Sequence, residues 1–157
     1  MAMGLLMAFV GPSAPARSAG ASEQLQVAMT VFKVTEDAFG NEALLPAEEA
    51  RPGDVLLYRA AYRNSGKSAL REVAAHVPVP PGLAYVNDSA RPAAEAASID
   101  GRAFFSIAQP PTPTPPPTWR TLRWAARDLA AGADFTVELR ARVLASGETA
   151  PPGPSAR

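Results

Sequence analysis

The chain has 157 residues, of which 47% are hydrophobic, with 15 basic and 15 acidic side chains. This length and hydrophobic content are sufficient for one domain with a buried core. The zero formal net charge gives no basic excess of the kind that nucleic-acid-binding proteins carry, so no nucleic-acid partner is expected. The absence of cysteine excludes disulfides, thiolate metal sites and a cysteine nucleophile. The 11 glycines and 17 prolines favour short strands joined by turns.

Residues 1–21 have the pattern of a secretory signal peptide. An uncharged apolar run over residues 1–10 stops before Pro12, and the segment ends in Ala19-Gly20-Ala21, an A-x-A cleavage signal. The run is too short to span a membrane. We therefore expect export to the periplasm, the cell surface or the medium, with Ser22 as the first mature residue and no transmembrane span in the mature chain. The alternative is a buried N-terminal strand.

Alternating apolar and polar residues, the period of a half-buried strand, dominate the mature domain, residues 22–145. The first such strand places four side chains on one face: Leu25, Val27, Met29 and Val31. The segment 35–53 reads as a connection with a short strand at Leu44-Leu45. The strand over 55–64 then places two sets on opposite faces: Leu56, Tyr58, Ala60 and Tyr62 against Leu57, Arg59, Ala61 and Arg63.

The middle of the domain is predicted to contain shorter strands. A strand over 70–77 points Val73, Ala75 and Val77 inward and Glu72 and His76 outward, and Pro78 stops its ladder because proline has no N–H to donate. Extended structure resumes over 83–86. The segment 98–107 is predicted to form a hairpin around a two-residue turn at Asp100-Gly101.

A proline-rich segment over 110–118 must be extended and polyproline-like. A stiff segment of this kind suits recognition, but it is equally suited to a spacer, and both interpretations stay open. After it, a strand over 121–126 carries Trp124, and a turn is expected over 128–133.

The clearest strand, over 135–143, follows that turn. The tail, residues 146–157, is expected to be disordered. About seven short antiparallel strands with regularly spaced turns predict an all-β fold, an immunoglobulin-like β-sandwich.

The turn motifs resemble a known family. The order is Pro52-Gly53-Asp54, then Tyr58, then Asn64-Ser65-Gly66, then Pro80-Pro81-Gly82-Leu83, and finally Asp128-Leu-Ala-Ala-Gly132 before the last strand. This order is similar to that of the conserved repeat domain of bacterial and archaeal surface proteins, the domain-of-unknown-function family numbered eleven, over roughly residues 25–144. The resemblance implies an extracellular immunoglobulin-like module used as a spacer or adhesive element, with no known catalytic residues.

Each motif also has a structural reason. Gly53 and Gly66 can supply the positive φ of tight turns. Asp54 can accept backbone hydrogen bonds at its turn, and Pro80 with Gly82 makes a rigid corner.

Residues suited to chemistry are few. His76, the only histidine, is expected on an outward strand face, where it is a poor candidate for a general base. One histidine without cysteine cannot make a typical zinc or copper site. Several carboxylates, including Asp37, Asp54 and Asp100, fall in expected loops, where they either cap turns or bind calcium. We expect turn capping, no cofactor, no metal and no enzymatic activity.

Two groups of side chains are candidates for contact with a partner. Arg59 and Arg63 on one strand, and Arg140 and Arg142 on another, form a basic stripe if the two strands are adjacent. The alternative is a solvated face with Glu72 and Glu138 as counter-charges. Trp119 is either an exposed aromatic contact or part of the packing.

These features predict a noncatalytic exported module that contacts another envelope or surface protein through a sheet edge or its loops. A glycan- or calcium-binding surface domain is the alternative.

Overall fold

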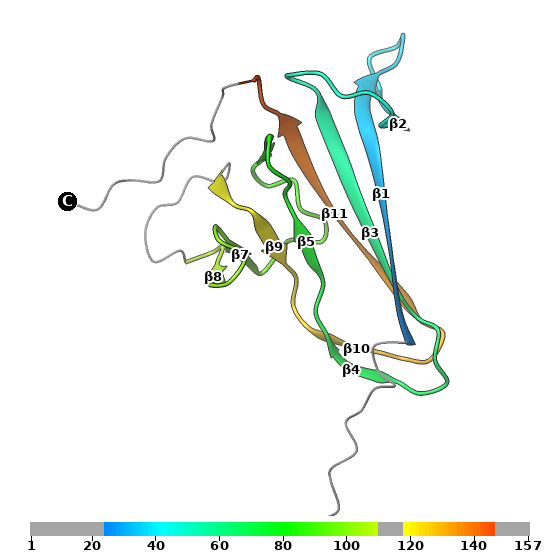
Figure 1. Ribbon diagram of the computed structural model, residues 1–157. Helices are drawn as coiled ribbons and strands as arrows, with labels where there is room; N and C mark the ends of the chain where they lie inside the picture. The colour runs from blue at the N-terminus through cyan, green and yellow to red at the C-terminus, as the bar shows by residue number, and fades with distance from the viewer. Residues whose placement is uncertain (1–23, 110–117, 147–157) are drawn as a thin grey trace, which may run out of the picture.

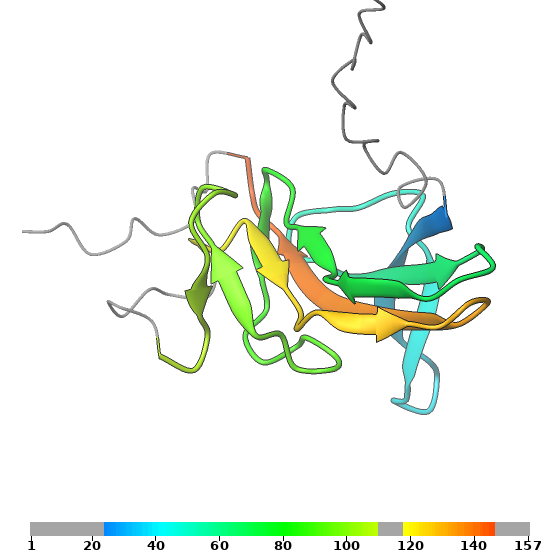
Figure 2. The same cartoon turned by 90° about the horizontal axis from the view of Figure 1, so that it is seen from below.

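The computed structural model describes residues 24–109 and 118–146. The expected signal peptide, nearly all of the proline-rich segment and the tail therefore lie outside the described residues. The described chain forms antiparallel sheets in two layers (Figures 1 and 2), so the predicted all-β sandwich is confirmed. Within these residues no helix is long and apolar enough to cross a membrane.

The first layer is a five-stranded sheet in the order β2-β1-β3-β11-β6. Its strands are β1 (Leu25–Glu36), β2 (Glu42–Pro46), β3 (Val55–Asn64), β6 (Leu83–Tyr85) and β11 (Asp134–Val143). Strand β11, the last in sequence, lies between β3 and β6 in this order and beside β3 in Figure 1. It pairs with β3 over nine residues, from Asp134↔Arg63 to Arg142↔Val55. All five were expected from the sequence as extended segments.

The second layer combines a four-stranded and a two-stranded sheet. The four-stranded sheet runs β5-β9-β7-β8, with β5 (His76–Pro78), β9 (Thr121–Arg123), β7 (Ala96–Ser98) and β8 (Phe105–Ser106). The two-stranded sheet pairs β4 (Leu70–Val73) with β10 (Arg127–Leu129). Figure 2 shows these strands as a layer in front of β11.

Two predicted strands are interrupted in this layer. The strand expected over 70–77 breaks into β4 and β5, and the strand expected over 121–126 ends at Arg123 and continues as β10. At the break the Trp124 N–H donates to the Ala75 carbonyl, 3.0 Å away, while the indole turns into the core. This bond continues the β5–β9 register by one position, and the register shifts beyond it, between Arg127↔Val73 and Leu129↔Leu70. The turn expected over 128–133 accordingly begins only after Leu129.

The hairpin over 98–107 exists, but its predicted two-residue turn is wrong. Strands β7 and β8 pair through Ala97↔Phe105, so the connection spans residues 99–104. The Asp100 carboxylate accepts hydrogen bonds from the N–H groups of Arg102 and Ala103, at 2.8 and 3.0 Å. Because Asp100 satisfies these donors itself, the loop closes locally instead of through a tight strand-to-strand turn.

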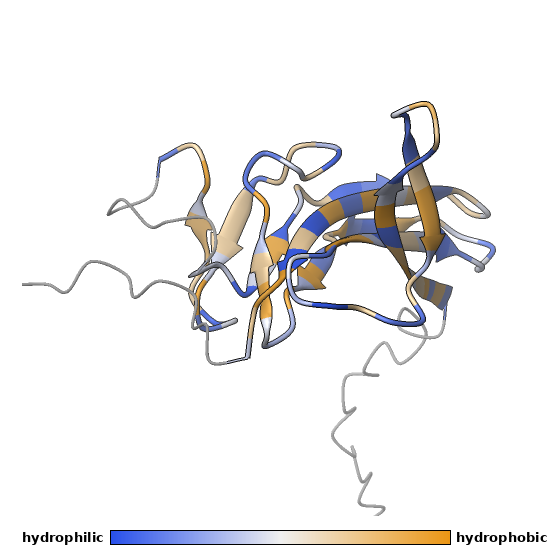
Figure 3. Ribbon diagram, turned by 90° about the horizontal axis from the view of Figure 1, so that it is seen from above, coloured by the Kyte–Doolittle hydropathy of each residue, from blue (hydrophilic) through white to orange (hydrophobic). Residues whose placement is uncertain are grey.

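The core lies between the inner faces of the two layers. From the first layer it receives alternate side chains of β3 and β11, as the sequence predicts: Leu56, Tyr58, Ala60, Tyr62, Val137, Leu139 and Ala141. The second layer contributes Val77, Leu122 and Trp124, each at most 1% exposed. Figure 3 shows the resulting alternation of apolar and polar residues along the long strands.

The turn at Pro52-Gly53-Asp54 has the predicted chemistry. Gly53 has φ +91°, a conformation that side chains with a Cβ rarely adopt. Asp54 accepts a hydrogen bond from the Arg51 N–H at 2.8 Å and an ion pair from Lys33 at 2.7 Å. The turn is also joined to the end of β11, because the Gly53 N–H donates to the Val143 carbonyl.

The positive φ predicted for Gly66 is wrong. Gly53, Gly82 and Gly132 have a positive φ, and Gly66 does not. A Cβ at Gly66 would lie 2.4 Å from the Gln24 side chain. Glycine at this position therefore makes room for a neighbouring side chain. At the second corner, Gly82 has φ +81° and the Leu83 N–H donates to the Pro80 carbonyl, so the expected turn is present there.

Candidate interaction surface

The four arginines of the expected basic stripe do lie on one face of adjacent strands, but their charge is partly neutralised. The register pairs Arg59 with Glu138, and these two side chains form an ion pair. Arg140 makes a bidentate pair with Glu42 at 2.7 and 2.8 Å. Two of the four arginines on this face are therefore ion-paired, with Glu138 as the predicted counter-charge to Arg59.

The other expected members of that face differ in their surroundings. Arg63 is exposed, and Arg142 is engaged in an interaction within the described structure. Glu72 lies on β4 in the second layer, so it is not the counter-charge that the sequence predicted. Glu42, from β2, takes this role. It was missed because β1 and β3 lie between β2 and β11, and only the assembled sheet brings residues 42 and 140 together.

Trp119 is 7% exposed and stacks on Tyr85 with ring centroids 5.8 Å apart. It belongs to the packing and is not the exposed aromatic contact that the sequence offered as one interpretation. His76 is exposed, as predicted, and its ring meets the edge of Phe104 at 5.4 Å. Neither residue lines a pocket described below or a cleft of the kind that an active site requires.

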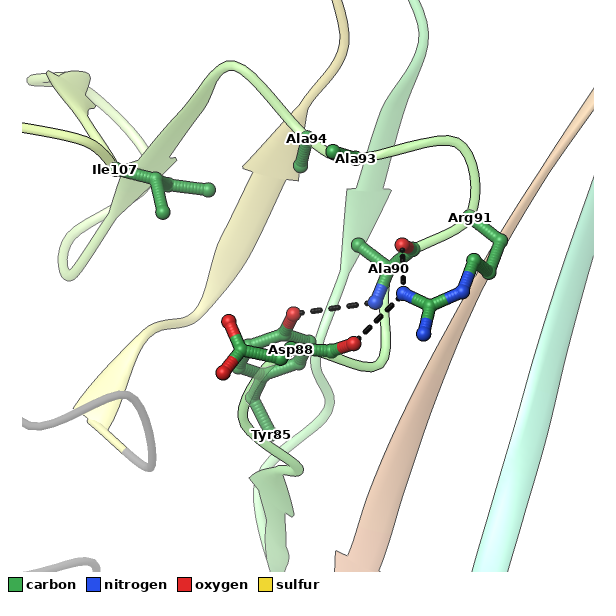
Figure 4. A pocket seen from close by; sticks show the side chains of 7 residues that line it. All are labelled: Tyr85, Asp88, Ala90, Arg91, Ala93, Ala94 and Ile107. Carbon is green, nitrogen blue, oxygen red and sulfur yellow. Dashed lines mark hydrogen bonds between the residues drawn. The ribbon is translucent and has the colours of Figure 1, made fainter.

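A small hollow lies beside β6. Its volume is 130 Å³, and Tyr85, Ala90 and Ile107 contribute to its lining (Figure 4). This volume holds a few waters and is smaller than the 300–1,000 Å³ typical of ligand sites. The Arg91 guanidinium donates to the Asp88 and Ala90 carbonyls, at 2.7 and 2.8 Å, so the most strongly polar group here is used to hold the loop.

Loop carboxylates cap turns in the structure. Asp37 accepts hydrogen bonds from the N–H groups of Phe39 and Asn41, at 2.8 and 2.9 Å. Asp54 and Asp100 accept backbone hydrogen bonds in the same way. In the part of the chain that is described, no three acidic or histidine side chains gather as a metal site would require. The contacts therefore support capping as the role of these carboxylates.

The hydrogen bonds to these carboxylates make the stability of the fold depend on pH. Hydrogen bonds from Asn41 to Asp37, from Lys33 to Asp54 and from Arg102 to Asp100 hold the pKa of each carboxyl below its ordinary 3.8. A folded-state pKa below the unfolded one gives stability that is complete above pH 3.8 and is lost as pH falls through the folded pKa.

We therefore expect the melting temperature to be steady from neutral pH to about pH 5 and to fall below pH 3.8. Asp100→Asn keeps an acceptor oxygen but cannot ionise, so its acid-induced fall should be shallower than that of the wild type. Differential scanning fluorimetry across pH 2–7 measures both curves. Parallel curves for the two proteins would contradict the role of Asp100.

The first half of β1 is an open strand edge. Strand β2 pairs with β1 only from Phe32↔Pro46 to Glu36↔Glu42. Strand β3 pairs with β1 along the other side from Leu25 to Val34. Residues 25–31 of β1, called the open edge below, therefore have a described strand neighbour on one side only.

The hydrogen-bond phase shows which groups the open edge presents. The Ser65 N–H donates to the Gln24 carbonyl at 2.8 Å, so even-numbered residues of β1 exchange hydrogen bonds with β3. In an antiparallel ladder the intervening residues direct their N–H and C=O groups to the other side. Leu25, Val27, Met29 and Val31 consequently direct their backbone donors and acceptors away from β3.

The open edge carries no charged side chain, and its inner face is apolar. Val27 is 52% exposed and Met29 is 44% exposed. Both point to the inner face, because the register places them opposite Tyr62 and Ala60. The core clusters reach the two ends of this face, where Leu25 and Val31 are partly buried, and leave Val27 and Met29 between them exposed. Long, apolar and uncharged edges are sites where sheets accept another strand.

The β5 edge of the second layer, by contrast, is blocked. The Tyr62 hydroxyl donates to the His76 carbonyl and accepts from the His76 N–H, both at 3.1 Å. Two residues further along β5, Pro78 has no N–H. Each of these features prevents a strand from pairing with β5, as natural edge strands commonly do. The described structure thus has an open edge at residues 25–31 of β1 and a protected edge at β5.

Removing the Tyr62 hydroxyl tests this protection. Tyr62→Phe keeps the ring, which stacks on Phe135 at 4.9 Å, but leaves the His76 N–H and C=O without their partner. We expect the free energy of unfolding to fall by about 1 kcal/mol, measured by urea denaturation. Tyr58→Phe is the control, because the Tyr58 hydroxyl makes no hydrogen bond within the described residues. Equal losses in both variants would count against the capping role.

No protein-family model matches this chain. The comparisons with curated proteins and with solved structures also give no match. The resemblance to the surface-protein repeat family therefore stays a prediction that rests on the turn motifs alone.

The sequence pointed to a sheet edge in general but did not locate it. The alternation of Leu25, Val27, Met29 and Val31 predicted one buried face. One signal in the sequence was missed: residues 24–32 contain no charged side chain. A half-buried strand next to solvent ordinarily carries charge, so an uncharged run suggests an interface.

Proposed function

We propose that the protein is an exported, noncatalytic module of the bacterial cell envelope that contacts another protein through the open edge of β1. The observation that carries this proposal is the combination of unpaired strand backbone with exposed Val27 and Met29. The inference of export rests on the signal-peptide pattern over residues 1–21. The immunoglobulin-like arrangement is part of the proposal and is supported by the order of the turn motifs.

The side chains that the sequence offered as candidates for ligand or partner contact have structural roles. Trp119 is packed in the core, the turn carboxylates accept backbone N–H groups, and Arg59 and Arg140 are held in ion pairs. These contacts favour a contact module over a glycan or calcium site, which would need such groups directed toward a ligand.

Site-specific photocrosslinking in cells tests the proposal. A photoreactive residue at Val27 should give protein adducts in the envelope fraction, and the recovered protein should begin at Ser22. The same residue at Arg63, exposed on the opposite face of the same sheet, is the matched control and should give few adducts. Cytosolic material with an intact Met1, or equal adducts at both positions, would overturn the proposal.

A further inference from the structure

We propose that the partner at the open edge is a second copy of this chain, paired antiparallel along residues 25–31 about a two-fold axis at Ala28. This inference rests on the proposed function only in its use of the same edge. It would join the two five-stranded sheets through β1, so that β1 of one copy lies beside β1 of the other.

The backbone phase permits this pairing. The outward-directed residues are odd-numbered, and an antiparallel match centred on Ala28 places Val27 opposite Met29 of the second copy and Leu25 opposite Val31. Odd residues therefore face odd residues, which is the condition for each opposing pair to exchange two hydrogen bonds. Ala28 faces its own copy in a pair without hydrogen bonds.

The length of the open edge also matches. Pairing with β2 begins at Phe32, one residue beyond Val31. In the two-fold arrangement the strand of the second copy ends its pairing at Leu25, opposite Val31. The seven residues of each open edge are thus filled. Gln24 of the second copy would fall opposite Phe32, the position that Pro46 of β2 occupies, so the chain has to leave the ladder at that residue.

The side chains are self-complementary. On the inner face, Val27 and Met29 of each copy form one apolar cluster of four side chains that are 52% and 44% exposed in the single chain. On the outer face, Gln26 lies opposite Thr30 of the second copy. No charged side chain occurs from residue 25 to 31, so self-pairing brings no like charges together.

A second copy fits better than an unrelated strand because the requirements are symmetric. A two-fold contact uses one patch on both molecules, and the open edge satisfies every pairing condition with itself. An unrelated partner would need its own exposed, uncharged strand, for which the structure provides no charge or shape signal.

The absence of cysteine in the chain allows a direct test of the register. Two-fold pairing puts Ala28 opposite itself at a Cα separation of about 4.5 Å, within the range of a disulfide. Ala28→Cys in the purified full chain should therefore give a disulfide-linked dimer under mild oxidation. Thr30→Cys is the matched control: two copies of Thr30 lie four residues apart along the ladder, about 14 Å, and should not link.

Sedimentation of the chain without an introduced cysteine provides the second measurement. The wild type should show a concentration-dependent dimer, and Val27→Pro should be monomeric, because proline removes an N–H that faces the open edge and not one bonded to β3. Phe39→Ser, which removes an 89% exposed side chain elsewhere, should remain dimeric. Circular dichroism checks that each variant is folded.

A monomer at all concentrations, or a Thr30→Cys dimer as abundant as that of Ala28→Cys, would overturn the self-pairing. The self-pairing would also be overturned if the photocrosslinked adducts from cells contained only a different envelope protein and no second copy of this chain. That last result would leave the proposed function intact, whereas cytosolic location would overturn the function and not the dimer.

Discussion

Replacing Asn64 with alanine is expected to lower the free energy of unfolding by about 3 kcal/mol. Asn64 is fully buried, and its amide nitrogen lies 2.8 Å from the Ser68 carbonyl, 2.9 Å from Leu129 and 3.1 Å from Ala130. The side-chain oxygen accepts from the Gly66 N–H at 2.9 Å. Alanine would leave these groups without their partner in the interior, and each costs about 1–3 kcal/mol when unsatisfied.

The expected loss is large because Asn64 joins two turns that are distant in sequence. It holds the turn after β3 against the turn before β11, so its loss loosens the same end of both central strands. Asn41→Ala is the matched control, since Asn41 lies in an exposed turn and donates only to Asp37. Urea denaturation should show a loss below about 0.5 kcal/mol for the control. A similar small loss for Asn64→Ala would show that the clamp contributes little.

Replacing Trp124 with alanine should lower the free energy of unfolding by about 3–5 kcal/mol. Trp124 is 1% exposed, and its indole N–H donates to the Pro92 carbonyl at 2.6 Å. Alanine removes the largest fully buried side chain and leaves a cavity. Because small domains have total stabilities of about 5–15 kcal/mol, a marked drop in melting temperature is expected.

A second substitution separates packing from hydrogen bonding at this position. Trp124→Phe retains an aromatic ring but cannot donate to Pro92, so a smaller loss than that of alanine is expected. Phe39→Ala, at an 89% exposed position, controls for loss of an aromatic side chain without burial. Thermal unfolding by circular dichroism ranks the three variants. A ranking in which Trp124→Ala equals Phe39→Ala would contradict the core role of Trp124.

The long strands could be predicted because their side-chain pattern has a single physical cause. Residues 135–143 alternate strictly. In residues 55–64 the predicted inner set Leu56, Tyr58, Ala60 and Tyr62 is buried, together with Leu57 on the opposite face. The interruptions at Ala75 and Trp124 could not be predicted in this way. They depend on which strands meet across the second layer, and periodicity within one segment carries no information about its partner.

The candidate surface was harder to predict for a related reason. Alternation in β1 indicates which side chains share a face, but not whether a second layer covers that face. Val27 and Met29 satisfy the pattern of buried residues and are exposed. For Trp119 the sequence left exposed contact and packing both open, and its stacking on Tyr85 decides for packing.

The central position of β11 bears on how the protein reaches its compartment. The five-stranded sheet needs residues 134–143 between β3 and β6, so the earlier strands lack their middle neighbour until nearly the whole described chain has emerged from the ribosome. Pairings between segments this far apart form slowly. If the chain is exported as proposed, it completes this sheet only after its final strand has passed through a translocation channel.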